Sequence, residues 1–343
     1  MKAAVWTDYG KMEIQEVPMP VIGEDEVLLK VRAAGLCMTD LHVYTGQFLY
    51  GKPPHILGHE ICAEVAELGK GVTGIQVGQR VLVETSIGCG ACEACRKGNR
   101  HLCASREEIG TAPHYGGYAQ YMKAPAKNVI PIPDEVTDEE AAIIESVVCP
   151  SGGLMRIGVR MGETVVVYGV GPAGLAFIQT AKALGAGKVI AVARNRKRLE
   201  RTLEFGADEI ICSSEENVTE RILELTGGNG AGLVCEATGA ASIIEETVDV
   251  AANGGRVLLY GLPSESAQMQ FPVKTIIMKQ LEVHGVENNP YVWEPLLKLV
   301  AGGRVNLKSM VTHTFPLEKI EDAFAVLENK KEDPIKIVVY PWK

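Results

Sequence analysis

The chain carries four cysteines within fifteen residues, in the spacing Cys89-x2-Cys92-x2-Cys95-x7-Cys103. A loop with this spacing can wrap one ion, because each thiolate can lie about 2.3 Å from a tetrahedral Zn²⁺ without regular secondary structure. Sulfur would fill every coordination position, so the pattern predicts a structural zinc site with no place for substrate. The alternatives are two disulfides, which suit small secreted chains, and an iron–sulfur cluster, whose bacterial-ferredoxin spacing ends in Cys-x3-Cys-Pro.

A second set of metal-ligating residue types lies in separate segments. Cys37 and His42 occur in GLCMTDLH, His59 and Glu60 in GHE, and Glu145 follows much later. One cysteine, one histidine and a carboxylate can form an open tetrahedral zinc site with water or substrate in the last position. A lone cysteine and a lone histidine are more often core residues. The complete four-cysteine motif nevertheless favours the metal interpretation.

The segment GVGPAG contains the pattern Gly169-x-Gly171-x-x-Gly174, with Pro172 and Ala173 between the last two glycines. It lies between the strand-like run TVVVY and the helix-like run LAFIQTAKAL, which is the context of a dinucleotide-binding turn. Glycines there let the backbone approach a pyrophosphate at the helix N-terminus. A plain strand-to-helix turn is the alternative, and the sequence predicts the cofactor site.

The end of the next strand-like run indicates which cofactor binds. An NAD site places Asp or Glu there to accept the ribose 2′-hydroxyl. This chain instead has Ala193, then Arg194, and Arg198 one helical turn later. A small residue leaves room for a 2′-phosphate, and arginine offers it charge-assisted hydrogen bonds. The sequence therefore predicts a preference for NADP over NAD; a solvated helix start or a basic nucleic-acid patch are the alternatives.

Two domains are expected from 343 residues. The first third has short Val/Ile/Leu runs bounded by turn residues, typical of an irregular β domain. From Glu163 onward, strand-like runs alternate with helix-like runs, which indicates a doubly wound parallel α/β sheet. The tail ends on the strand-like IKIVVY, which we assign to the first domain. We therefore expect a β domain over 1–150 and 288–343, and a dinucleotide-binding domain over 151–287.

Composition excludes several classes. A hydrophobic content of 46% with 22% charged residues is that of a globular protein, and the net charge of −9 disfavours nucleic acid and anionic membranes as partners. The longest apolar stretch, residues 165–178, is interrupted by glycines and a proline and is shorter than the ~20 residues of a membrane helix. Nine cysteines, an odd number, and the lack of an apolar N-terminal signal fit a reducing cytoplasm.

Taken together, GLCMTDLH, GHE, the four-cysteine lobe, GVGPAG and VTHTFPLEKIEDAF occur in this order over essentially the whole chain. This series resembles the zinc-dependent medium-chain dehydrogenases of the alcohol dehydrogenase superfamily, and most of all their sorbitol/polyol and threonine branch. The resemblance implies a GroES-like catalytic domain carrying two zinc ions, a Rossmann domain, and an active site in the cleft between them. It also suggests a homotetramer.

The resemblance assigns roles to individual residues. It implies catalytic zinc ligation by Cys37 and His59, with Glu60 and Glu145 exchanging with water. It makes Thr39 the hydroxyl that hydrogen-bonds the substrate oxygen, and it makes His42 the histidine that relays a proton to solvent through the cofactor ribose.

The function expected from the residues and the resemblance is reversible oxidation of a secondary hydroxyl of a polyol, or a similar small alcohol, to a ketone with NADP. Met38 stands where the family usually has glycine, and Asn288 where sorbitol-type enzymes have arginine, so sorbitol itself is not assigned. The alternatives are threonine, a simple alcohol or aldehyde, or a cyclitol with NAD. A zinc-free reductase of the superfamily and a non-catalytic zinc- and nucleotide-binding protein are further alternatives.

Overall fold

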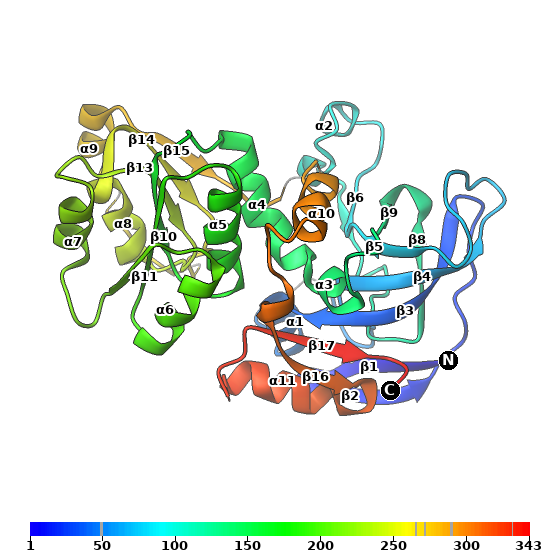
Figure 1. Ribbon diagram of the computed structural model, residues 1–343. Helices are drawn as coiled ribbons and strands as arrows, with labels where there is room; N and C mark the ends of the chain where they lie inside the picture. Colours follow the sequence, from blue (N-terminus) through cyan, green and yellow to red (C-terminus); the bar gives the residue numbers. More distant parts are fainter. Residues whose placement is uncertain (49–50, 265, 271, 289–290, 331) are drawn as a thin grey trace. The chain divides into compact units, whose positions relative to one another are not determined.

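The structure, a computed structural model, describes residues 1–48, 51–264, 266–270, 272–288, 291–330 and 332–343 (Figure 1). The chain folds into two compact units, one of residues 1–146 with 307–343 and one of residues 147–306. Residues 147–150 and 288–306, which the sequence analysis placed in the first domain, thus belong to the second unit. Hydrogen bonds from Arg304 to Ala183 O (2.6 Å) and from Asn306 N to Gln179 Oε1 (2.5 Å) hold this segment there.

The first unit contains a large mixed sheet, antiparallel except for the parallel pair β16–β17, together with smaller two-stranded sheets and short helices. Its strands are β1 Lys2–Asp8, β2 Lys11–Glu16, β3 Glu26–Leu36, β4 Glu60–Leu68, β5 Arg80–Val83, β6 Ser86–Ile87, β7 Glu107–Glu108, β8 Tyr121–Pro125, β9 Val129–Pro131, β16 Val311–Pro316 and β17 Lys336–Tyr340. Its helices are α1 Met38–Tyr44, α2 Glu93–Arg96, α3 Asp138–Ile143, α11 Ile320–Asn329 and the short 3₁₀ helices Arg100–Leu102, Ala126–Asn128, Lys308–Met310 and Leu317–Lys319.

Among the described residues, the large sheet has seven strands, in the order β16-β17-β3-β4-β5-β9 with β8 added beside β3. The C-terminal strand β17 pairs antiparallel with β3, and the two are the red and blue strands labelled in Figure 1. This pairing places Ile337 opposite Leu36. On the other side of β3, Gly35 lies opposite Glu60, the first residue of β4. The sheet therefore brings the C-terminal strand next to the GLCMTDLH and GHE segments, which adjoin β3 and β4.

The second unit alternates strands and helices around a six-stranded parallel sheet in the order β12-β11-β10-β13-β14-β15. This is the strand order 3-2-1-4-5-6 of the doubly wound Rossmann fold, and it confirms the predicted fold class. The strands are β10 Thr164–Tyr168, β11 Lys188–Ala193, β12 Glu209–Cys212, β13 Ala231–Glu236, β14 Ala251–Leu259 and β15 Glu282–Gly285. The helices are α4 Glu145–Ile157, which begins in the first unit, α5 Pro172–Ala183, α6 Arg196–Thr202, the 3₁₀ helix Leu203–Phe205, α7 Val218–Leu225, α8 Ala241–Val250, α9 Val273–Lys279 and α10 Trp293–Ala301.

The apolar stretch of residues 165–178 becomes the central strand β10, a glycine turn and the start of α5. Val165, Val166 and Val167 are fully buried, as expected for a central strand covered on both faces. In the described part of the chain, no helix combines the length and the hydropathy that spanning a bilayer requires.

Candidate metal centres and cofactor site

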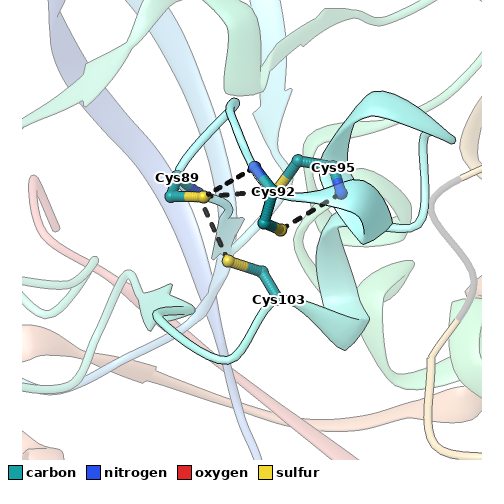
Figure 2. Close-up of side chains that lie close together, drawn as sticks. All are labelled: Cys89, Cys92, Cys95 and Cys103. Atoms are coloured by element: carbon teal, nitrogen blue, oxygen red, sulfur yellow. Dashed lines mark hydrogen bonds between the residues drawn. The ribbon is translucent and has the colours of Figure 1, made fainter.

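The four-cysteine loop gathers its sulfur atoms around one centre (Figure 2). The ligand atoms of Cys89, Cys92, Cys95 and Cys103 all lie within 4.8 Å of one another, and none of the four forms a disulfide. The short helix α2 begins after Cys92, whose sulfur accepts a hydrogen bond from Cys95 N at 3.4 Å. The loop thus presents a complete set of four sulfur ligands, which fits a closed tetrahedral zinc site.

Backbone amides around this loop favour thiolates over thiols. Cys92 N donates to Cys89 Sγ at 3.4 Å, and Cys89 N donates to Cys103 Sγ at 3.5 Å. Hydrogen bonds from the amides of Ala91 and Cys92 lower the pKa of the Cys89 thiol. Because the thiolate is the form that binds metal, these amides prepare Cys89 for a cation, whereas burial raises the pKa of the Cys95 thiol.

A second group consists of Cys37, His59 and Glu60, whose ligand atoms also lie within 4.8 Å of one another. Cys37 is the residue before α1, and Glu60 is the first residue of β4. The structure thus brings together three of the four residues predicted for the catalytic metal. Glu145 lies outside this group, although its Oε2 is 3.8 Å from His59 Nε2.

Glu60 is fully buried, and its surroundings are built to hold a carboxylate. A Cβ at Gly35 would lie 2.0 Å from Glu60 Oε2, so glycine is needed at that position. The buried Lys336 of β17 donates to Glu60 Oε1 and, at 2.8 Å, to Leu36 O. Within the described residues Glu60 Oε2 has no hydrogen-bond partner. An unpartnered buried carboxylate oxygen beside a thiol and an imidazole fits a bound cation.

Asp40 orients His59 from behind. Its Oδ1 lies 3.1 Å from His59 Nδ1, and its Oδ2 accepts hydrogen bonds from Cys37 N (3.1 Å) and Tyr118 OH (2.9 Å). Burial raises the pKa of Asp40 and lowers that of His59, but the pairing outweighs burial, so the pKa of Asp40 is lowered and that of His59 raised. Such carboxylate–imidazole pairs leave Nε2 free for a metal, which displaces the proton.

Glu145 begins α4, and its side chain is 16% exposed. Burial, together with the nearby Glu60, raises its pKa to about 7, against the opposing effect of His59 and Lys336. A cation bound beside it would favour the ionised form. Glu145 is thus placed to approach a metal held by the other three residues.

Helix α1 carries the two residues predicted to move a proton. Thr39 and His42 are three residues apart on α1 and are therefore neighbours on its surface. The His42 ring is half-buried and packs edge-on against Phe48, with 4.7 Å between ring centroids. Burial lowers the pKa of His42 below 6.5, so the ring is neutral at pH 7 and able to accept a proton.

The predicted dinucleotide turn has the required local geometry. Gly169 has a positive φ of 93°, and a Cβ at Gly174 would lie 1.9 Å from Gly169 O. Around Gly171, by contrast, a Cβ would meet nothing within 4 Å, which leaves open space at the start of α5. Pro172 and Ala173 open that helix. The turn can therefore admit a pyrophosphate at the helix N-terminus.

Residues 193–198, at the end of β11, contain no carboxylate, and Glu215 after the neighbouring strand β12 is paired with Arg196. Ala193 is the last strand residue, Arg194 is exposed, and Asn195 caps α6 by accepting from Arg198 N at 3.1 Å. Ser214 Oγ and Cys212 Sγ both donate to Arg194 O, at 3.0 and 3.3 Å, and fix the backbone there. The exposed guanidinium of Arg194 can donate charge-assisted hydrogen bonds to a 2′-phosphate at this position.

Three residues around the Cys37, His59 and Glu60 group received no role in the sequence analysis. Lys336 lies 276 positions from Glu60, Asp40 was seen only as part of a motif, and Gly35 was not considered. Asp40 could have been found from its spacing, because it follows a ligand cysteine by three residues at a helix start. Nothing local in the sequence indicates Lys336.

Comparison with known proteins agrees with this geometry. Residues 23–134 match the alcohol dehydrogenase GroES-like domain, and residues 172–302 match the zinc-binding dehydrogenase domain. The chain is 34% identical to the sorbitol dehydrogenase of Bacillus subtilis (strain 168) over 345 aligned residues, covering 99% of this chain and 97% of that protein. The chain belongs to the zinc-binding alcohol dehydrogenase family.

Further members of the family are similar over nearly the whole chain. The L-threonine 3-dehydrogenase of Bacillus licheniformis is 36% identical, covering 95% of this chain and 94% of that protein. A zinc-binding dehydrogenase from Sinorhizobium meliloti 1021, solved bound to NADP, superposes with a TM-score of 0.93 at 31% identity, with 99% of each chain covered. These findings confirm that this dehydrogenase is an oxidoreductase built from a GroES-like and a Rossmann domain, as the sequence predicted.

Proposed function

We propose that this dehydrogenase oxidises a secondary hydroxyl of a polyol, or of a similar small alcohol, reversibly to a ketone, with a preference for NADP⁺ over NAD⁺. The observation that carries the proposal is that the ligand atoms of Cys37, His59 and Glu60 lie together. Helix α1, which follows Cys37 directly, carries the proton-accepting residues Thr39 and His42. Cys37, His59, Glu60 and Glu145 would hold one zinc ion per subunit, and the four-cysteine loop a second.

Zinc held by Cys37, His59 and Glu60 would act as a Lewis acid that lowers the pKa of the substrate hydroxyl. The nicotinamide would take the hydride. The chain's own residues handle the proton. Thr39 accepts a hydrogen bond from the substrate hydroxyl, and His42, on the same face of α1, receives the proton onward. Asp40 holds His59 in the orientation that a ligand needs.

The carboxylate set supports a polyol more than a simple alcohol. Glu60 and Glu145 can exchange with water at the metal, which leaves room for a substrate with more than one hydroxyl. The relatives include enzymes named for sorbitol and for threonine, so threonine with NAD is the second candidate. We further propose a homotetramer in the reducing cytoplasm, where the nine cysteines stay free of disulfides.

Initial rates at 340 nm test the proposal. A polyol, a cyclitol, a simple secondary alcohol and threonine are each assayed with NADP⁺ and with NAD⁺. We expect turnover of a polyol with NADP⁺. Turnover of threonine alone would replace the polyol by threonine as the substrate. Activity with NAD⁺ alone would replace NADP⁺ by NAD⁺ as the cofactor.

Replacing Arg194 with alanine should reverse the cofactor preference. Loss of hydrogen bonds from a charged donor to the 2′-phosphate should reduce kcat/KM with NADP⁺ by about 10- to 100-fold and leave NAD⁺ little changed. Arg221→Ala is the control, because that arginine of α7 pairs with Glu216, before the helix, and with Glu224 on it. An unchanged NADP⁺/NAD⁺ ratio in Arg194→Ala would remove Arg194 from the cofactor site.

Replacing His42 with glutamine should change the pH profile of alcohol oxidation. Because burial lowers the pKa of His42 below 6.5, the neutral, proton-accepting form is present above that pKa and is lost as the pH falls through it. The native enzyme should therefore lose activity as the pH falls through the lowered pKa of His42, and the variant should be about 100-fold slower with this limb flattened. An identical acid limb in both proteins would assign it to another group.

A further inference from the structure

The second unit buries a carboxylate that the mechanism above does not use. Glu236 is the last residue of β13 and is fully buried at the carboxyl edge of the parallel sheet. It lies opposite Tyr168 of β10 on one side and Leu259 of β14 on the other. A buried carboxylate is costly unless it is hydrogen-bonded, so its donors indicate what it does.

Among the described residues, the donors to the Glu236 side chain come from the loop that follows it. Oε1 accepts from Thr238 N at 2.5 Å and from Gly239 N at 3.0 Å, and also from Thr238 Oγ1. Gly239 N lies 3.3 Å from Oε2 as well. The buried carboxylate therefore fixes the conformation of residues 237–240, while Thr238 itself is exposed.

Glu236 also holds the neighbouring loop, which follows β14. Its carbonyl oxygen accepts from Tyr260 N at 3.0 Å and from Gly261 N at 3.2 Å. A Cβ at Gly261 would lie 2.1 Å from Gly239 N and 2.8 Å from Glu236 Oε2. The two loops thus pack backbone to backbone, the first bonded to the side chain of Glu236 and the second to its main-chain carbonyl.

The same loop packs against the pyrophosphate turn. Ala237 N donates to Tyr168 O at 2.9 Å, directly before the first glycine of the motif. A Cβ at Gly169 would lie 3.0 Å from Thr238 Cγ2. Glu236 therefore sits where β10 and β13 meet, the point at which the strand order reverses and at which open α/β sheets bind dinucleotides.

We propose that Glu236 is a positioning residue for the nicotinamide half of the cofactor, an inference that rests on the proposed dinucleotide site. In this fold, the half-sheet β10–β12 takes the adenosine half and β13–β15 takes the other mononucleotide. Leu262, 79% exposed on the second loop, offers an apolar side chain to a flat ring. Glu236 touches neither half of the cofactor; it acts through the two loops that it holds.

The test compares two ligands by isothermal titration calorimetry on the zinc-containing enzyme: NADPH, and adenosine 2′,5′-bisphosphate, which lacks the nicotinamide half. Glu236→Gln removes the charge and replaces one of the two acceptor oxygens by an NH₂ donor, so that only one oxygen is left for the amides of Thr238 and Gly239. We expect the Kd for NADPH to rise about 10- to 100-fold and the Kd for the bisphosphate to change less than about 2-fold. Glu246→Gln is the matched control, because that carboxylate accepts from Tyr168 OH at 3.0 Å without touching either loop.

Thr238→Val removes one donor from the exposed loop and keeps the test open if Glu236→Gln does not fold. It should weaken NADPH binding several-fold and spare the bisphosphate. Equal changes for both ligands, or none, would show that Glu236 serves the fold alone and would overturn the inference. If the native enzyme binds NADH but binds the bisphosphate no better than AMP, the NADP proposal is overturned instead. The role of Glu236 is then tested in the same way with NADH and ADP-ribose.

Discussion

The Cys37→Ser variant is expected to lose about 1,000-fold or more of kcat/KM and one of two zinc ions per subunit. A neutral hydroxyl is a poor substitute for a thiolate ligand, and Glu60 Oε2 would remain buried without a partner. Lewis-acid stabilisation is worth several kcal/mol at the transition state, and each ~1.4 kcal/mol is a factor of ten in rate. Steady-state kinetics and metal analysis by mass spectrometry measure the two losses on the same sample.

Cys62→Ser is the matched control. Cys62 lies on β4, two residues after Glu60, and is equally part of the first unit. Burial and the nearby Asp138 raise its pKa well above the usual range, and Cys62 belongs to neither of the two groups of candidate metal ligands found among the described residues. This control should keep both zinc ions and most of the activity. Full activity in Cys37→Ser would refute the catalytic metal centre.

The Cys103→Ser variant is expected to have the largest effect on stability. Metal binding supplies about 10–16 kcal/mol of folding free energy in small zinc domains. Even a third of this would lower Tm by roughly 10 °C, at about 2–4 °C per kcal/mol for domains of this size. Differential scanning calorimetry at a fixed scan rate measures the shift, and a zinc chelator should reproduce it in the native enzyme.

The two cysteine variants control one another. Cys103→Ser should lose the zinc of the four-cysteine loop and retain the metal at Cys37, whereas Cys37→Ser should retain the loop zinc and the native Tm within a few degrees. A Cys103→Ser enzyme with unchanged zinc content and Tm would mean that the loop, although its sulfur atoms lie within 4.8 Å of one another, holds no structural ion.

Much of the second unit could be predicted from the sequence, because its signals are local. The run TVVVY followed by three spaced glycines contains the strand, the turn with a positive φ at Gly169, and the start of α5. The four-cysteine loop is equally local, since its ligands are separated by a few residues and close on one another through a single loop. Backbone sterics and the reach of a short chain decide such features.

The limits of the two units were less accessible. The helix-like pattern PYVWEPLLKLVAGG has an apolar face, and an apolar face can pack on either domain. The hydrogen bonds of Arg304 and Asn306 to α5 place this segment in the second unit. The apolar periodicity of the segment does not indicate these hydrogen-bond partners, which lie far away in the sequence.

The sequence alone determined the residue types that can bind zinc and a dinucleotide, the order of strands and helices, and, by the absence of a carboxylate after β11, the basis for expecting NADP. Only the tertiary structure decided which groups support those residues. Lys336 bonds Glu60 because β17 pairs with β3. Glu236 accepts hydrogen bonds from the loops after β13 and β14 because these two strands are neighbours in the sheet. The physical reason is range: turns and ligand spacings depend on adjacent residues, whereas the partner of a buried charge depends on which distant strand the sheet places beside it.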